Sequence, residues 1–465
     1  MNQKKQLLKN TVIIAIGKLS TQIISFLLLP LYTSKLSPEE YGTYDFLVTL
    51  SIFLLPIITL MMEESMFRFI IDAEDVKSKK RIITATIGYT MFGTILFTII
   101  AGVVMGIMHY EYAIVFILFI ISNILIGLSN ALARGMGKIK LYSLSNFILG
   151  VSTIILNILF ILEFKMGTKG LLWANTIANS ATAIYILMKL KLPKYISRKY
   201  LNRKTLSEMI KYSIPLVPNN LSWVIISLSD RLMLTWLSGA DSNGIYSISN
   251  KFPNIVYTFY GFFSTAWKES AARILKEDNK TEYYNSIYKD INNFLKAIVI
   301  GLIAVMPFAF PILVDSSYSD AYIYIPILTI AIYYTNMSNF YGGIFAAYKD
   351  TKIMGATTII AAIINIIINL IFIPAFGIYA ASFSTLISNI VVYTYRRKRL
   401  KTYIKLKSKY NYIYWTLLAI TLITYYINNM VINVIMFVIV LMYCIYTNKK
   451  FLQSTLEPVI SKLKR

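Results

Sequence analysis

The sequence predicts an all-α polytopic membrane protein with about 14 transmembrane helices, built as two related six-helix lobes followed by two further helices. Three observations lead to this fold class. Hydrophobic residues make up 57% of the 465 residues and charged residues only 15%, a composition typical of polytopic membrane proteins. Apolar runs of about 18 residues or more, long enough to cross about 30 Å of hydrocarbon, follow one another along nearly the whole chain. The two halves of the chain also share sequence.

The predicted spans begin close to the N-terminus, and their boundaries are placed to within about four residues. The first apolar segment is longer than the hydrophobic region of a signal peptide and lacks a small-residue cleavage site after it. We therefore expect it to be retained as a helix. The spans cover residues 11–33, 43–66, 82–108, 112–133, 143–163, 170–190, 212–238, 244–266, 291–314, 320–345, 353–374, 377–395, 411–428 and 429–447.

The net charge of +24 is explained by topology rather than by nucleic-acid binding. If the N-terminus is cytoplasmic, most of the 46 Lys and Arg residues fall in cytoplasmic segments. This positive-inside bias predicts that both termini are cytoplasmic. Basic runs such as Arg396, Arg397, Lys398 and Arg399 come just past a predicted helix end, where we expect them to anchor to anionic headgroups.

An internal repeat relates the two halves of the chain. Sliding the chain by 202 residues places spans 1 and 2 over spans 7 and 8 without gaps. Six spans per repeat is an even number, so both halves enter the membrane from the same side, as in parallel-repeat transporters with a substrate path between the lobes. The matching pairs include Lys9 with Lys211, Ser20 with Ser222, Gly42 with Gly244 and Tyr44 with Tyr246.

The repeat predicts how the chain is divided. We expect an N-lobe at 1–190, a basic cytoplasmic linker at 191–211 and a C-lobe at 212–400. The remaining segment, 401–465, holds the last two helices and a cytoplasmic tail.

Polar stripes run along spans 1, 7 and 8. Residues spaced by four, seven or eleven positions occupy one face of a helix. One face of each lobe's first helix is therefore polar and carries a cation, which a cleft between two related lobes would require. The stripes are Thr11, Lys18, Gln22, Ser25 and Tyr32 on span 1; Ser213, Asn220, Ser227, Arg231 and Ser238 on span 7; and Asn243, Asn250, Asn254, Tyr257, Gly261, Ser264 and Lys268 on span 8, with Lys251 about 100° round the helix.

Charged residues inside the spans allow a functional and a structural interpretation. A cation at the bilayer centre costs roughly 2.5 to 3.5 kcal/mol on insertion scales, but one near a helix end reaches water at little cost. We favour a cavity-lining role for Lys18 and Arg231 and leave both interpretations open for Lys251. Asp230 is interpreted as a structural partner of a nearby cation, with a proton carrier as the alternative.

The inner ends of spans 2 and 4 carry further charged residues. Glu63, Glu64 and Arg68 crowd the inner end of span 2, where an inner gate and a cap at headgroup level are equally good interpretations. For Arg134, which opens the next inner loop, the positive-inside bias is slightly favoured over a gating role.

The motifs of common enzymes are absent from the sequence. It has no G-x-x-x-x-G-K-[ST] motif, so it does not hydrolyse ATP through a P-loop. The sole histidine, His109, leaves no His-based metal site, and the sole cysteine, Cys444, leaves no internal disulfide. Every predicted outer loop is short, whereas membrane polymerases and glycosyltransferases usually carry catalytic groups on a sizeable one. We therefore expect a transporter without catalytic residues, cofactor or metal.

Several segments in order along the chain resemble one family. They are the opening LKNT…GKLSTQIISFLLLPLYTSKLSPEEYGTYDF, then MMEESMFRFI, NALARGMGKIKLY and PNNLSWVIISLSDRLML…NGIYSISNKFP…AWKESA. Together they resemble bacterial polysaccharide-repeat-unit flippases of the multidrug/oligosaccharidyl-lipid/polysaccharide (MOP) exporter superfamily. The resemblance covers the whole chain.

The resemblance implies translocation of undecaprenyl-diphosphate-linked oligosaccharides across the bacterial cytoplasmic membrane, for O-antigen (lipopolysaccharide), capsule or exopolysaccharide assembly. It implies alternating access through a cationic central cavity, coupling to an H⁺ or Na⁺ gradient, and membrane lipids and the polysaccharide polymerase machinery as partners. Cations would hold the diphosphate, and amide, hydroxyl and aromatic groups would contact the sugars. The candidate cavity residues are Lys18, Gln22, Ser25, Asn219, Asn220, Trp223, Ser227, Arg231, Asn250, Lys251, Asn254 and Tyr257, and the candidate gating or coupling residues are Glu64, Arg68, Arg134 and Asp230.

Three alternatives remain open. A flippase for the lipid-linked peptidoglycan precursor would differ only in cargo. A cation-coupled drug antiporter of the same superfamily would use an acidic rather than a basic cavity. A membrane scaffold of a glycan-assembly complex would not transport at all, and would keep supporting polymer synthesis when Lys18 and Arg231 are neutralised.

Overall fold

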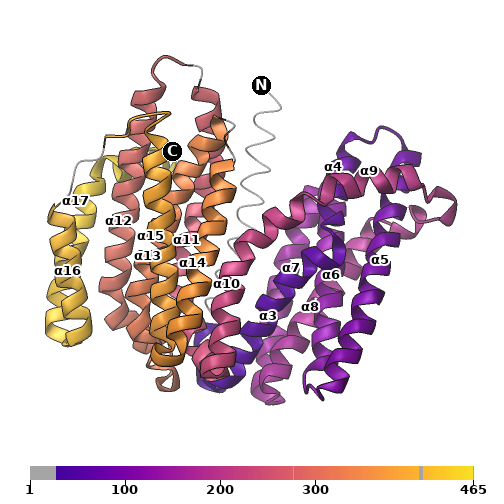
Figure 1. Cartoon of the computed structure of the whole chain (residues 1–465), viewed down its shortest axis with the longest axis horizontal. Coiled ribbons are helices and arrows are strands. Elements are labelled where there is room, and N and C mark those ends of the chain that lie inside the picture. The colour runs from indigo at the N-terminus through magenta and orange to yellow at the C-terminus, as the bar shows by residue number, and fades with distance from the viewer. Residues whose placement is uncertain (1–27, 276, 349, 351, 408–411, 464–465) are drawn as a thin grey trace. The chain divides into compact units, whose positions relative to one another are not determined.

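The computed structural model describes residues 28–275, 277–348, 350, 352–407 and 412–463. Within these ranges all regular structure is helical and no strand occurs (Figure 1), which confirms the predicted all-α fold class. The chain divides into two compact units, Met1–Arg231 and Leu232–Arg465.

The first unit is a helical bundle, and its boundary with the second unit falls within α10 (Leu216–Ser238), after Arg231. Its helices are α2 (Leu29–Lys35), α3 (Pro38–Thr59), α4 (Met62–Asp72), α5 (Val76–Ile107), α6 (Ala113–Gly135), α7 (Ile139–Ile158, with a π-helical turn at Leu159–Glu163), α8 (Gly167–Lys189), α9 (Arg203–Ser213) and α10 (Leu216–Ser238), with short 3₁₀ turns at Leu192–Lys194 and Arg198–Tyr200.

The second unit begins within α10 and contains the remaining helices. They are α11 (Ala240–Ile274), α12 (Lys280–Leu313), α13 (Ala321–Ala347), α14 (Lys352–Phe376), α15 (Ile378–Leu400), α16 (Tyr412–Ile427) and α17 (Met430–Leu463), with a 3₁₀ turn at Ser316–Tyr318.

The helices coincide with the predicted spans. Within the described ranges, eight helices are long and apolar enough to cross a membrane. The other predicted spans after the first lie on α10, α11, α13, α15 and α16, and span 1 lies outside the described residues. The most apolar stretch of α5 is only 11% buried, against 56% for that of α12. Apolar faces as open as that of α5 are suited to hydrocarbon rather than water.

The start of α3 shows why the chain becomes helical there. Ser37 and Glu40 form a capping box, in which the Glu40 N–H donates to Ser37 Oγ (3.2 Å) and the Ser37 N–H donates to Glu40 Oε2 (2.9 Å). Pro38 occupies the first helical turn, where a missing N–H costs nothing. Thr168 Oγ1 also donates to the Glu40 carbonyl (2.8 Å), so the start of α8 is tied to the start of α3.

Span 2, predicted as one helix over 43–66, is interrupted. Leu60 and Met61 adopt left-handed backbone conformations (φ 47° and 53°), which separate α3 from α4. Tertiary contacts hold α4 in its own direction, because Ser65 Oγ donates to the Met209 carbonyl of α9 (3.1 Å). Hydropathy detects an apolar run but not such a break, since the contact that fixes it comes from a distant segment.

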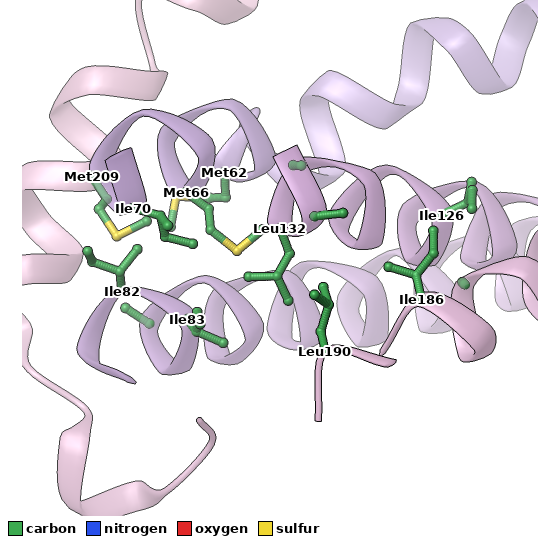
Figure 2. Close-up of a cluster of buried hydrophobic side chains, with 14 residues drawn as sticks. Met62, Met66, Ile70, Ile82, Ile83, Ile126, Leu132, Ile186, Leu190 and Met209 are labelled. Atoms are coloured by element: carbon green, nitrogen blue, oxygen red, sulfur yellow. The ribbon is translucent and has the colours of Figure 1, made fainter. Parts of the chain in front are cut away.

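Each unit has its own core. In the first, Met62, Met66, Ile83 and Leu132 belong to a buried cluster between α4, α5, α6 and α8 (Figure 2). In the second, Trp267 of α11 stacks on Phe340 of α13 with ring centroids 4.5 Å apart, and its Nε1–H donates to the Phe340 carbonyl (2.9 Å).

Candidate functional site

The best-defined polar contact of the candidate residues is centred on Arg231 of α10. Its Nε donates to Asp45 Oδ2 of α3 at 2.5 Å, and its Nη1 donates to Ser227 Oγ at 2.7 Å. Ser227 lies one turn earlier on the same face of α10. The Arg231 side chain is only 13% exposed and that of Asp45 15%. The guanidinium is therefore largely withdrawn from solvent, and its charge is compensated by a carboxylate.

Asp45 is a candidate that sequence reasoning missed. The sequence does carry a signal for it, because Asp45 is an acid near the outer start of span 2, close to Gly42 and Tyr44 of the internal repeat. The sequence predicts Asp230 as the structural partner of a nearby cation without identifying that cation, and the structure buries Asp230 at 2% exposure. Asp45 is far from Arg231 in sequence, so only the folded chain identifies it as a partner of the guanidinium. The role of Asp230 itself stays a prediction.

The remaining candidates of the first unit are only partly described. Lys18, Gln22 and Ser25 lie outside the described residues, as do the side chains of Asn219 and Trp223. Asn220 is exposed on α10. Ser227, another candidate of this unit, accepts the hydrogen bond from Arg231 Nη1.

The candidates of the second unit share α11. Asn250 donates from Nδ2 to the Tyr246 carbonyl of its own helix (2.9 Å), and Lys251 and Asn254 are partly buried. Tyr257 is 43% exposed. Asn250, Asn254 and Tyr257 are three and four residues apart, so they occupy one side of the helix. An amide, a hydroxyl and an aromatic ring on one face are groups that can contact a sugar.

The candidate gating residues make local contacts. Arg68 pairs with Asp72 one turn along α4 (2.5 Å), with 48% and 63% of the two side chains exposed. The Arg134 guanidinium lies over the Phe67 ring at 4.4 Å from the centroid, which fastens α6 to α4. These contacts favour structural roles for both arginines. Glu64 is partly buried, while its neighbour Glu63 has one carboxylate oxygen, Oε2, that is buried and has no hydrogen-bond partner in the described chain.

The prediction that Arg396 anchors at headgroup level is wrong. The side chain is buried at 1% exposure because α15 continues to Leu400. Its Nε donates to Thr357 Oγ1 (2.9 Å), its Nη1 to the Ser338 carbonyl (3.1 Å) and its Nη2 to the Met354 carbonyl (3.2 Å). Arg396 therefore joins α13, α14 and α15, whereas Arg397, Lys398 and Arg399 are exposed. The sequence alone does not distinguish the first arginine of the run from the others.

A second buried cation, Lys296, holds α16 against α12 within the second unit. Lys296 of α12 is 7% exposed, and its ammonium lies 4.9 Å from the centroid of the Tyr414 ring and 5.9 Å from that of Trp415. Across the described residues, no group of His, Cys, Asp and Glu side chains is arranged to hold a metal ion.

Comparison with known proteins agrees with this architecture. Residues 7–267 match the family model described as "Polysaccharide biosynthesis protein", and residues 215–371 match the MatE model. An uncharacterized membrane protein of Methanocaldococcus jannaschii is 24% identical over 293 residues, which are 59% of this chain and 68% of that protein.

Solved structures share the fold at low sequence identity. The lipid II flippase MurJ in an inward closed conformation superimposes with a TM-score of 0.72 and 14% identity, over 97% of this chain and 100% of that one. An inward-facing multidrug resistance MATE family transporter of the MOP superfamily gives a TM-score of 0.64 and 14% identity, over 83% and 98%. A MOP superfamily transporter from Pyrococcus furiosus gives 0.56 and 14%, over 86% and 96%.

These matches confirm the resemblance found in the sequence. The family model covers more than half of the chain, and the shared fold extends over nearly all of it. The chain therefore belongs to the polysaccharide biosynthesis protein family and has the fold of the flippases and exporters of the MOP superfamily.

Proposed function

We propose that this protein translocates undecaprenyl-diphosphate-linked oligosaccharide repeat units from the cytoplasmic to the outer leaflet of the bacterial cytoplasmic membrane. It would act by alternating access and supply units for O-antigen, capsule or exopolysaccharide assembly. Family membership and the MOP fold support a transporter of this class. We propose in addition that the translocated units pass to the polysaccharide polymerase machinery as a downstream partner.

The observation that carries the proposal is the Arg231–Asp45 ion pair. A lipid diphosphate carries about two negative charges, which hydrocarbon does not accept without compensating cations. Arg231 is a largely buried guanidinium on a membrane-embedded helix, and such a group is suited to bind phosphate through several N–H donors.

Asp45 gives this site a resting state. An unpaired buried cation costs several kcal/mol, so Arg231 needs an anion when no substrate is bound. Asp45 provides that anion at 2.5 Å. We propose that the diphosphate takes the place of Asp45 on the guanidinium during binding and that Asp45 returns after release. One anion is then exchanged for another, and the guanidinium is never left without a partner.

The proposed sugar contacts follow from α11. Asn250, Asn254 and Tyr257 share one side of that helix, and Tyr257 is the most exposed of them. We propose that they contact the sugars, while the lipid tail stays in the bilayer. Lys18, Gln22 and Ser25 remain proposed cavity residues on the strength of the sequence repeat.

The test is a depletion strain complemented with charge variants. Arg231→Ala is expected to stop surface polymer synthesis and to leave lipid-linked repeat units on the inner face, where mass spectrometry of lipid extracts identifies them. Arg399→Ala, which removes an exposed arginine, serves as the matched control and is expected to complement. Normal polymer synthesis with Arg231→Ala would contradict the transport proposal and favour a scaffold.

A lipid-linked peptidoglycan precursor is the second candidate cargo. The observation that favours it is the fold shared with the lipid II flippase over 97% of this chain. The same lipid extracts separate the two, because accumulated peptidoglycan precursor in place of an oligosaccharide diphosphate would assign the chain to that cargo. A drug antiporter would leave neither intermediate.

A further inference from the structure

The first unit contains an apolar groove of about 360 Å³ outside the polar stripes. Its lining is almost entirely aliphatic and comes from α4, α5, α6, the end of α8 and the segment after α8; on α5 it includes Thr90 and Thr94. The two threonines do not make it polar, since Thr90 Oγ1 donates to the Thr86 carbonyl (2.8 Å) and Thr94 Oγ1 to the Thr90 carbonyl (2.6 Å) of their own helix.

The groove has a buried floor and an open side. Ile83, Met66 and Leu132, which are 0%, 2% and 2% exposed, belong to the core cluster between α4, α5 and α6 (Figure 2). Met91 and Ile95 at the rim are 58% and 55% exposed. Both belong to α5, the helix whose apolar stretch is 11% buried. An open side formed by apolar side chains of a span-length helix is suited to hydrocarbon rather than to water.

The dimensions of the groove match one leaflet. Along α5 the lining runs from Ile83 to Ile95, which at 1.5 Å per residue is about 18 Å. Half of a hydrocarbon core about 30 Å thick is about 15 Å. A groove of this length accommodates a single acyl chain running from the headgroup level to the bilayer midplane.

One end of the groove lies against a cationic segment. Leu192 and Ile196 belong to the stretch that links α8 to α9, and this stretch is tied to α5. Thr84 Oγ1 donates to the Tyr195 carbonyl (3.2 Å), and the Lys80 ammonium lies 5.2 Å from the centroid of the Tyr200 ring. The exposed lysines of the stretch are Lys189, Lys191, Lys194 and Lys199. At the mouth of an acyl-chain groove, these cations complement a negatively charged headgroup.

We propose that this groove binds one acyl chain of an anionic phospholipid of the cytoplasmic leaflet, with the headgroup held by the lysines of the 189–199 segment. The aliphatic lining supplies the affinity for the chain, and the lysines supply the preference for negative charge. The bound lipid fills the space between the 189–199 segment and α5, and it holds that segment at the membrane surface.

Native mass spectrometry of the purified full chain tests the proposal, with phosphatidylglycerol and phosphatidylcholine of identical acyl chains as probes. We expect one retained phosphatidylglycerol and at least a fivefold lower occupancy by phosphatidylcholine. Thr94→Trp, which fills the groove, is expected to lower phosphatidylglycerol occupancy about fivefold. Ile99→Trp, on an exposed part of α5 outside the groove, is the matched control and is expected to leave it unchanged.

A second variant does not depend on repacking the groove. Replacing Lys191, Lys194 and Lys199 together by Gln is expected to abolish the preference for phosphatidylglycerol. The same change at Lys401, Lys405 and Lys407, in the basic segment after α15, is expected to preserve it. Equal occupancy by the two lipids in the unaltered protein would overturn the proposal. Displacement of the phospholipid by an equimolar polyprenyl phosphate would also overturn it and would assign the groove to an isoprenoid chain.

Discussion

Replacing Asp45 by Asn is the change most directly tied to the proposed site. The Asn side chain keeps an oxygen near Arg231 Nε but removes the negative charge. Losing one partner of a fully buried ion pair costs about 3–5 kcal/mol, whereas exposed pairs contribute about 0.2–1 kcal/mol. The two side chains are 13% and 15% exposed, so the pair is closer to the buried limit. We expect Asp45→Asn to destabilise the protein by about 2–3 kcal/mol.

A double-mutant cycle isolates the pair from the other effects of each change. Asp45→Asn, Arg231→Gln and the double variant are unfolded in detergent by heat or denaturant, and the coupling free energy is expected to be about 1–3 kcal/mol. Arg68 and Asp72 offer a matched control at the same 2.5 Å distance, because their side chains are 48% and 63% exposed. That pair is expected to couple more weakly, because water screens exposed charges. Equal coupling in the two cycles would refute the argument from burial.

The same substitution has an opposite effect on binding. If Asp45 and the lipid diphosphate compete for Arg231, removing the carboxylate is expected to tighten binding of undecaprenyl diphosphate by about tenfold, or about 1.4 kcal/mol. Turnover is expected to fall, because no carboxylate displaces the bound diphosphate. Weaker binding by Asp45→Asn than by the unaltered protein would show that the two anions do not exchange.

Further predictions concern the buried cations, a helix cap and the driving force. Arg396→Met removes three buried hydrogen bonds, to Thr357 Oγ1 and to the Ser338 and Met354 carbonyls, and is expected to cost about 2–4 kcal/mol of unfolding free energy, whereas Lys398→Met, at an exposed position, is expected to be neutral in the same melt. Lys296→Met is expected to loosen α16, measured as faster hydrogen exchange around Tyr414, and unchanged exchange would count against the cation–π anchor. Hydrogen bonds from Ser78 lower the pKa of Asp75, the N-cap of α5. The ionised Asp75 cap therefore stabilises α5 fully at pH values above the usual Asp pKa of about 3.9. This stabilisation is lost as the pH falls through the lowered pKa of Asp75. Asp75→Ala is expected to remove this pH dependence from thermal melts. Moving about two negative charges outward against 100 mV, inside negative, releases roughly 4–5 kcal/mol, so an imposed potential should accelerate transport in proteoliposomes, and insensitivity to it would exclude potential-driven export.

Part of the candidate site could be predicted because intramembrane charges are visible in an apolar sequence. Arg231 was singled out in this way, since a cation in a span requires a compensating partner. The identity of that partner could not be found from adjacency, because Asp45 and Arg231 are 186 positions apart in the sequence and meet only in the folded chain. The same reason explains Arg396, whose three acceptors belong to α13 and α14.

Long apolar runs were sufficient to predict the all-helical membrane fold. An unpaired backbone group is costly to bury in hydrocarbon, so such runs form helices, which pair their own backbone groups. The sequence also carried the internal repeat and the family resemblance. The break of the second span at Leu60 and Met61, the carboxylate that compensates Arg231 and the apolar groove of the first unit became visible only in the folded chain. Those features depend on contacts between segments far apart in the chain, and local hydropathy contains no information about which distant side chains meet.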